Sequence, residues 1–125
     1  MARILLIEDD APVAEALRHL LLSGGHDVTL APNGRPAIRL HKEAPFDLII
    51  SDIIMPEMEG IETIRALRCI GEAVPIIAIS GGANFGPAYL PNLASAFGCS
   101  ATFEKPVHRE PFLAKIEELL AASRN

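Results

Sequence analysis

Short runs of apolar residues recur along the chain, and their lengths fit β-strands. They are ILLI at 4–7, DVTLA at 27–31, DLII at 47–50, PIIAI at 75–79 and a weaker ATF at 101–103. The first, third and fourth runs are continuous rather than alternating between apolar and polar residues. Continuous apolar runs are typical of strands that are buried on both faces of a parallel sheet.

Helical patterns separate these runs. Asp10 can cap the first helix, Pro12 fits its first turn, and Gly24 follows its end. A second helix is predicted over 36–43, after the turn pair Asn33-Gly34. The apolar face of the first helix is formed by Val13, Leu17 and Leu20.

Three more helices complete the pattern, and the fourth is predicted over 87–97. The third helix turns Arg65 and Arg68 away from its apolar face. The apolar faces of the third and last helices are Ile61, Ile64 and Leu67, and Phe112, Ile116 and Leu119. Strand and helix thus alternate five times, which predicts an α/β fold with a doubly wound parallel sheet of five strands and five helices. The pattern fills residues 1–125, which we interpret as a single domain.

Composition and charge argue against nucleic-acid-binding, secreted and membrane-spanning proteins. The chain has 125 residues, half of them hydrophobic, which is enough for one core. Its net charge of −5 and its single Tyr argue against a direct nucleic-acid partner. No apolar run is long enough for a signal peptide or a membrane span. Cys69 and Cys99 have no CxxC spacing, so we expect buried thiols in a reducing, cytoplasmic compartment.

Polar side chains follow the ends of four predicted strands. Glu8 and Asp9 follow the first, Asp52 the third, Ser80 the fourth and Lys105 the fifth. Carboxyl ends of parallel strands meet at one edge of the sheet, where ligands bind. Two carboxylates about 4 Å apart repel by roughly 4 kcal/mol at an effective dielectric near 20. A bound divalent cation would remove that repulsion, and oxygen ligands favour Mg²⁺ over Ca²⁺ or Mn²⁺, and all three over zinc.

This set of groups suits phosphoryl chemistry. Asp52 can act as a nucleophile and form an acyl phosphate. Lys105 and the metal would neutralise charge on the phosphoryl oxygens, and Ser80 could donate a hydrogen bond to one of them. Asp10 is interpreted differently, as the cap of the first helix.

The same stretches resemble the receiver domains of bacterial two-component response regulators. They are ILLIEDD at 4–10, FDLIISDIIMPEMEG at 46–60, PIIAISGG at 75–82 and EKPV at 104–107. The resemblance spans essentially the whole chain. It implies the flavodoxin-like receiver fold with strand order 2-1-3-4-5, and transfer of a phosphoryl group from the histidine of a partner kinase to an aspartate.

Carried over by motif, Asp52 corresponds to the phosphoacceptor, and Ser80 to the Ser or Thr that moves toward the phosphoryl group. Lys105 corresponds to the lysine before a cis-proline, here Pro106. The resemblance also implies an Mg²⁺ site. Asp9 corresponds to a direct ligand of the ion, and Glu8 to a ligand that acts through water. The phosphoacceptor Asp52 and the backbone carbonyl of Ile54 complete the implied set.

The chain departs from the family pattern in three places. Thr102 stands where members often have a switch aromatic, and Phe103 would face the other side of the strand. Glu59 replaces the commoner Asp before Gly60. Ile54 and Gly82 stand where side chains tune hydrolysis of the acyl phosphate, and apolar Ile54 cannot position a water molecule. We therefore expect a switch through Ser80, with Thr102 in the aromatic position, and slow autodephosphorylation.

The implied function is a stand-alone, chemotaxis-type phosphoacceptor that is not otherwise an enzyme. Its partners would be a histidine kinase or a histidine phosphotransfer protein, and a downstream protein that binds the fourth and fifth helices and the fifth strand. A phosphorylation-dependent homodimer is a further expectation. His19, His26, His41 and His108 show no metal spacing. His108 is predicted to lie at the N-cap position of the last helix, and the other three on the surface of helices or loops.

Two other functions remain as alternatives. One is a receiver-like binding module that is never phosphorylated, which the complete set of site residues disfavours. The other is an aspartate-nucleophile phosphatase of the haloacid dehalogenase type. That class needs a second Asp two residues after the nucleophile, where this chain has Ile54.

Overall fold

A single parallel sheet forms the centre of the molecule. The computed structural model describes residues 2–52, 59–70, 74–80 and 98–123. Its strands lie in the order β2-β1-β3-β4-β5, which confirms the predicted topology. Their bounds are β1 Arg3–Ile7, β2 Asp27–Ala31, β3 Leu48–Asp52, β4 Ile76–Ser80 and β5 Ala101–Glu104.

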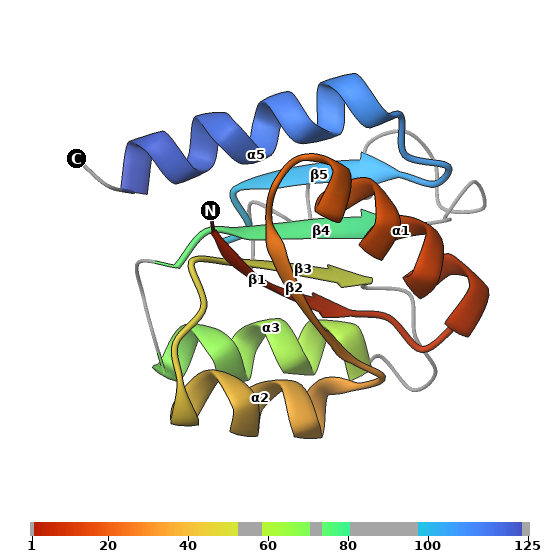
Figure 1. Ribbon diagram of the computed structural model, residues 1–125. Helices are drawn as coiled ribbons and strands as arrows, with labels where there is room; N and C mark the ends of the chain where they lie inside the picture. Colours follow the sequence, from red (N-terminus) through yellow and green to blue (C-terminus); the bar gives the residue numbers. More distant parts are fainter. Residues whose placement is uncertain (1, 53–58, 71–73, 81–97, 124–125) are drawn as a thin grey trace.

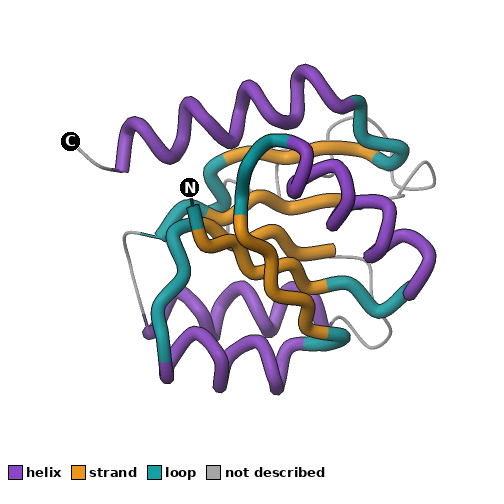
Figure 2. Tube along the Cα trace, in the orientation of Figure 1, coloured by secondary structure: helices purple, strands orange, loops and turns teal. Residues whose placement is uncertain are grey.

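Helices cover both faces of this sheet, so the molecule has three layers (Figures 1 and 2). α1 and α5 lie on one face, and α2 and α3 lie side by side on the other (Figure 1). Their bounds are α1 Ala11–Ser23, α2 Gly34–Glu43, α3 Glu59–Ile70 and α5 Arg109–Ser123. The predicted helix over 87–97 lies outside the described residues. No helix in the described part of the chain is long and apolar enough to cross a membrane.

Capping side chains fix where the first two helices begin. The Asp10 carboxylate accepts a hydrogen bond from the Val13 backbone N–H at 3.2 Å, as expected for the cap of α1. Asn33 caps α2 in the same way by accepting from the Arg35 N–H at 3.1 Å. Because of that cap, α2 starts at Gly34, two residues before the predicted start at Pro36.

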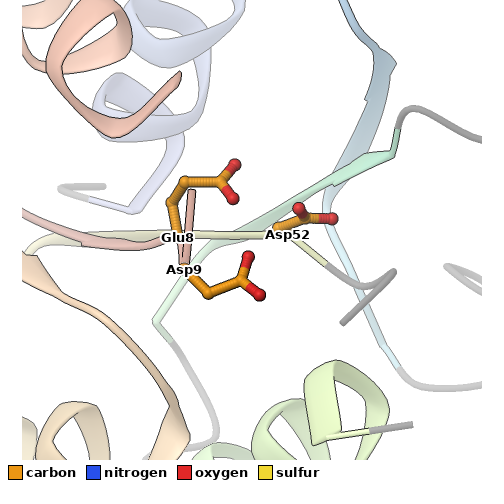
Figure 3. A group of neighbouring side chains, drawn as sticks. All are labelled: Glu8, Asp9 and Asp52. Carbon is orange, nitrogen blue, oxygen red and sulfur yellow. The ribbon is translucent and has the colours of Figure 1, made fainter. Parts of the chain in front are cut away.

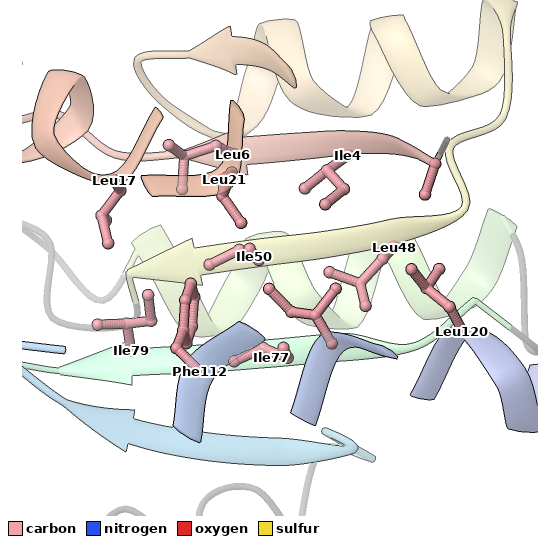
Figure 4. Close-up of a cluster of buried hydrophobic side chains, with 12 residues drawn as sticks. Ile4, Leu6, Leu17, Leu21, Leu48, Ile50, Ile77, Ile79, Phe112 and Leu120 are labelled. Carbon is pink, nitrogen blue, oxygen red and sulfur yellow. The ribbon is translucent and has the colours of Figure 1, made fainter. Parts of the chain in front are cut away.

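The core is split between the two faces of the sheet. On β1, Ile4 and Leu6 point to the α1/α5 face, whereas Leu5 and Ile7 point to the α2/α3 face, and all four are buried. A continuous apolar run was therefore a correct sign of a strand covered on both sides. Figure 4 shows the α1/α5 cluster, in which Phe112 of α5 packs among residues of β1, β3 and β4.

The apolar faces of two helices differ slightly from prediction. In α5 the third buried position is Leu120, while the predicted Leu119 is only partly buried. In α1, Leu21 is fully buried and Leu20 is partly exposed. Each shift is one residue, because a helical face is broader than a single line of side chains.

Two histidines are buried, so the prediction that His19, His26 and His41 lie on the surface is wrong for His26 and His41. His41 is 3% exposed, on the inner face of α2, one turn after Ala37. Its Nδ1 accepts a hydrogen bond from the Phe46 N–H at 3.1 Å, and burial lowers the pKa of the imidazole. His26, in the turn between α1 and β2, is 7% exposed.

Cys99 is a free thiol, as predicted, but it is only partly buried where a buried thiol was expected. It packs beside the α2/α3 cluster, and burial raises the pKa of its thiol. The side chain of Cys69 lies outside the described residues.

Candidate functional site

Three carboxylates meet at the carboxyl edge of the sheet. Glu8 and Asp9 directly follow β1, and Asp52 is the last residue of β3. One oxygen of each lies within 4.8 Å of the others. Figure 3 shows the Glu8 and Asp9 carboxyl groups both turned toward the side of Asp52. Glu8 and Asp52 are buried, whereas Asp9 is exposed.

Pairing of adjacent strands brings these residues together. β1 lies between β2 and β3, and Ile7 pairs with Ser51, so Glu8 follows β1 where Asp52 ends β3. The Glu8 N–H continues the ladder by donating to the Ala31 carbonyl at 3.1 Å. Its Oε2 accepts from the Asp10 N–H at 3.2 Å, so a backbone group of the following turn orients the carboxylate.

Lys105 joins two of the carboxylates. Its Nζ lies 2.7 Å from Glu8 Oε1 and 2.8 Å from Asp52 Oδ2. The Lys105 backbone N–H donates to the Ser80 carbonyl at 2.8 Å, which holds the end of β5 against β4. The following bond to Pro106 is cis, as the resemblance implied. The Glu8–Lys105 ion pair was not predicted. One signal for it was present in the sequence, because Lys105 is the one cationic residue among the predicted site residues.

The ionisation of these groups reflects burial and pairing. Burial raises the pKa of Glu8, and the hydrogen bonds from Lys105 and the Asp10 backbone only partly oppose that effect. Burial also acts to lower the pKa of Lys105. The hydrogen bonds to Asp52 and Glu8 outweigh it, so the pKa of the ammonium is raised and the group stays charged.

The residues present fit a small divalent cation. With all three carboxylates ionised, one ammonium leaves two negative charges uncompensated. Their oxygen atoms are the hard donors that Mg²⁺ prefers. Exposed Asp9 leaves the cluster open to solvent on one side. The predicted ligand Ile54 lies outside the described residues.

The remaining predicted residues lie on neighbouring strand ends. Ser80 is buried at the end of β4, one residue beyond the position paired with Asp52. Thr102 is half-buried on β5, opposite Ala78, which belongs to the α2/α3 cluster. Phe103 points to the opposite face, as predicted, and contacts Phe112 edge-on with ring centroids 5.0 Å apart.

An apolar groove of about 450 Å³ borders the site. It lies between α1 and the turn after β5, and the Lys105 side chain forms part of its wall. The other lining residues are Val13, Ala16, Leu17, Leu20, Pro106 and Val107.

Comparison with known proteins places this geometry in context. A family model described as the response regulator receiver domain matches residues 4–117. A curated relative, the cell cycle response regulator CtrA of Brucella ovis, is 31% identical over 122 residues. That match covers 98% of this chain and 51% of the relative. The chain therefore spans about half the length of the curated relatives it matches.

Solved structures agree in fold over nearly the whole chain. Chemotaxis protein CheY4 of Vibrio cholerae has a TM-score of 0.83 at 29% identity, covering 95% of this chain and 98% of that one. The receiver domain of sensor histidine kinase PA1611 from Pseudomonas aeruginosa has a TM-score of 0.84 at 27% identity, with 96% and 98% covered. The latter structure has a magnesium ion coordinated in its active site cleft.

Proposed function

This chain belongs to the response regulator receiver domain family, a family of phosphoacceptors in two-component signalling, and from that premise we propose that Asp52 is its phosphoacceptor. A carboxylate oxygen of Asp52 attacks the phosphorus of a phosphohistidine on a partner protein. The P–O bond to Asp52 forms as the P–N bond breaks, and the electron pair of that bond stays on the imidazole. The product is an acyl phosphate on Asp52.

Residues around Asp52 have separate roles in this proposal. The ammonium group of Lys105, 2.8 Å from Asp52 Oδ2, would move to the phosphoryl oxygens and neutralise charge there. Ser80, at the end of the adjacent strand, would donate a hydrogen bond to one of those oxygens. Bound Mg²⁺ supplies further positive charge beside the phosphoryl group. We assign its ligands to Asp9 and Asp52, Glu8 through water and the Ile54 carbonyl.

The observation that carries the proposal is the position of Lys105. One lysine from the end of β5 lies within 2.8 Å of a carboxylate from β1 and another from β3. Placing two buried carboxylates together is unfavourable unless the site binds positive charge. A structural ion pair would need one carboxylate, whereas the excess of negative charge here suits a bound cation. The magnesium site of the PA1611 receiver domain supports the same assignment.

Partners follow from the chemistry. The phosphodonor would be a histidine kinase or a histidine phosphotransfer protein in the cytoplasm, and the groove beside Lys105 gives that partner an apolar surface next to Asp52. The phosphorylated form would act on a downstream protein or pass the phosphoryl group on, with Ser80 and Thr102 near the responding surface. Apolar Ile54 predicts that the isolated protein keeps its phosphoryl group for minutes or longer, measurable by loss of mass after donor removal.

The proposal is tested by intact-protein mass spectrometry after incubation with acetyl phosphate, with and without Mg²⁺. We expect a gain of one phosphoryl group that requires Mg²⁺ and is lost in Asp52→Asn. Asp10→Asn is the matched control, since Asn caps a helix about as well as Asp and should leave phosphorylation intact. A mass gain that persists in Asp52→Asn, or none in the folded wild type with Mg²⁺, would contradict the assignment.

A further inference from the structure

His26 is a buried histidine that the phosphoacceptor chemistry does not use. It lies in the turn between α1 and β2, directly after Gly25, whose φ of 86° reverses the chain. The His26 side chain is 5% exposed. Both ring nitrogens are sealed from solvent and have no hydrogen-bond partner in the described structure. A buried N–H without an acceptor costs free energy, so this ring is poorly satisfied in its neutral form.

The side chain of Glu117, on α5, lies next to the His26 ring. Its Oε1 lies 3.3 Å from His26 Nε2, and its side chain is 63% exposed. An exposed glutamate keeps its solvation and its freedom to turn, so a small rotation would let it accept from the Nε2–H. The two residues come from segments far apart in the sequence, so their contact links the α1–β2 turn to α5.

The other charged groups around the turn have different partners. On α1, Arg18 pairs with Glu15, and on α5, Lys115 pairs with Glu118. Asp27, next in sequence, is exposed. The two nearby arginines also bind elsewhere, Arg109 to the Ser23 hydroxyl and Arg3 to Asp47 and the carbonyls of Ala44 and Pro45. Among the described carboxylates, Glu117 alone lies within ion-pair distance of His26.

From this arrangement we propose that His26 and Glu117 form a pH-responsive tie between the α1–β2 turn and α5. Protonation gives the ring a second N–H donor and a positive charge next to a carboxylate, which converts a poor contact into an ion pair. The tie is therefore stronger at acidic pH than at alkaline pH. α1 starts just after Asp9 and α5 just after the Lys105 turn, so the tie joins the turn after α1 to the middle of α5.

Thermal unfolding of the full chain at pH 5.5 and pH 8 tests the tie without any phosphodonor. Glu117→Gln should lower the midpoint by about 1–4 °C at pH 5.5, the range for a partly exposed ion pair in a chain of this size. At pH 8 the same substitution should lower the midpoint by less than half as much. Glu118→Gln, one residue along and paired with Lys115, is the matched control and should show no such pH difference.

A second variant separates the tie from general effects of charge on α5. His26→Phe keeps a buried ring and removes both nitrogens, so Glu117→Gln should then have the same effect at both pH values. The inference is overturned if Glu117→Gln in the wild-type background loses as much at pH 8 as at pH 5.5, or behaves like Glu118→Gln. That comparison stands even if His26→Phe does not fold, and it is independent of whether Asp52 is phosphorylated.

Discussion

Lys105 is the residue on which the charge balance of the site depends. The two side chains it joins are nearly sealed from water, with 1% exposure for Glu8 and 6% for Asp52. Removing one partner of a buried ion pair costs about 3–5 kcal/mol, because the remaining charge stays buried and unpaired. Here two carboxylates would lose the same cation, and Lys105 is itself 21% exposed, so the lower part of that range applies.

We therefore predict that Lys105→Met destabilises the metal-free protein by about 3 kcal/mol. Added Mg²⁺ should restore more stability to this variant than to the wild type, because the cation replaces the missing positive charge. Urea unfolding in EDTA and in Mg²⁺ measures both effects. Lys115→Met, which removes a partly exposed lysine of α5, is the control and should change little. Equal stabilisation of wild type and Lys105→Met by Mg²⁺ would place the metal elsewhere.

Buried His41 should make the stability of the protein depend on pH. Burial lowers the pKa of the folded imidazole below its ordinary value near 6.5, and Nδ1 must stay unprotonated to accept from the Phe46 N–H. Below that pH the unfolded chain binds the proton more readily. Stability from neutral His41 is therefore present above about pH 6.5 and is lost as pH falls toward the folded-state pKa.

His41→Asn should flatten the decline of unfolding free energy between pH 8 and pH 5.5, because the Asn oxygen can accept the same hydrogen bond without titrating. At pH 8 the variant should be about 1–3 kcal/mol less stable, since it loses the stacking of the ring on Phe46. His19→Asn, on the exposed face of α1, is the control. A slope for His41→Asn equal to that of the wild type would show that His41 does not account for the acid sensitivity.

At the scale of elements, the start of α2 packs against α3 at unusually short range. A Cβ added at Gly34 would lie 1.9 Å from Thr63 Oγ1 and 3.0 Å from Thr63 Cβ. Both residues are buried, so there is little room for either helix to give way. Glycine is needed at this position because the two helices approach closely.

Gly34→Ala should thus destabilise the protein by roughly 1–3 kcal/mol, although Gly→Ala in a helix ordinarily stabilises it. Thr63→Ala in the same chain should recover part of the loss, since it removes Oγ1 and Cγ2. A double-mutant cycle by urea unfolding gives the coupling between the two positions. Strict additivity of the two changes, or a Gly34→Ala variant more stable than wild type, would contradict the close contact.

The sequence predicted the elements well where hydrophobic pattern alone decides them. β1, β3 and β4 are continuous apolar runs, and the order of strands followed from the family resemblance. Contacts between elements could not be predicted in this way. Arg68 was expected simply to turn away from the core, yet its guanidinium donates to the carbonyls of Val74 and Gly98, both at 2.6 Å. His41 was missed because its hydrogen bond comes from a residue beyond its own helix.

In the site, the residues could be predicted from the sequence, but one contact between them could not. Glu8, Asp9, Asp52 and Lys105 were chosen because polar residues at the ends of buried strands need a reason to be there, and the structure brings them together. The ion pair between Glu8 and Lys105 could not be predicted, because it depends on the path of the turn after β5.

For the whole molecule, two layers of helices around one parallel sheet leave the ends of β1, β3, β4 and β5 at one edge, and the site residues are concentrated there (Figures 1 and 3). The chain carries a net charge of −5, and part of that excess lies in the cluster of Glu8, Asp9 and Asp52. The fold thus concentrates negative charge where a cation and a phosphoryl group would bind. We therefore expect the phosphoryl group to go to Asp52 and to no neighbouring carboxylate.

The most direct test identifies the modified residue by chemistry. After phosphorylation with acetyl phosphate and Mg²⁺, borohydride reduces an aspartyl phosphate to homoserine, and peptide mass spectrometry locates the change. Phosphorylation of Asp52 predicts homoserine at position 52 and unmodified aspartate at positions 9 and 10. Homoserine at either of those two positions, or at none in folded protein with Mg²⁺ present, would contradict it.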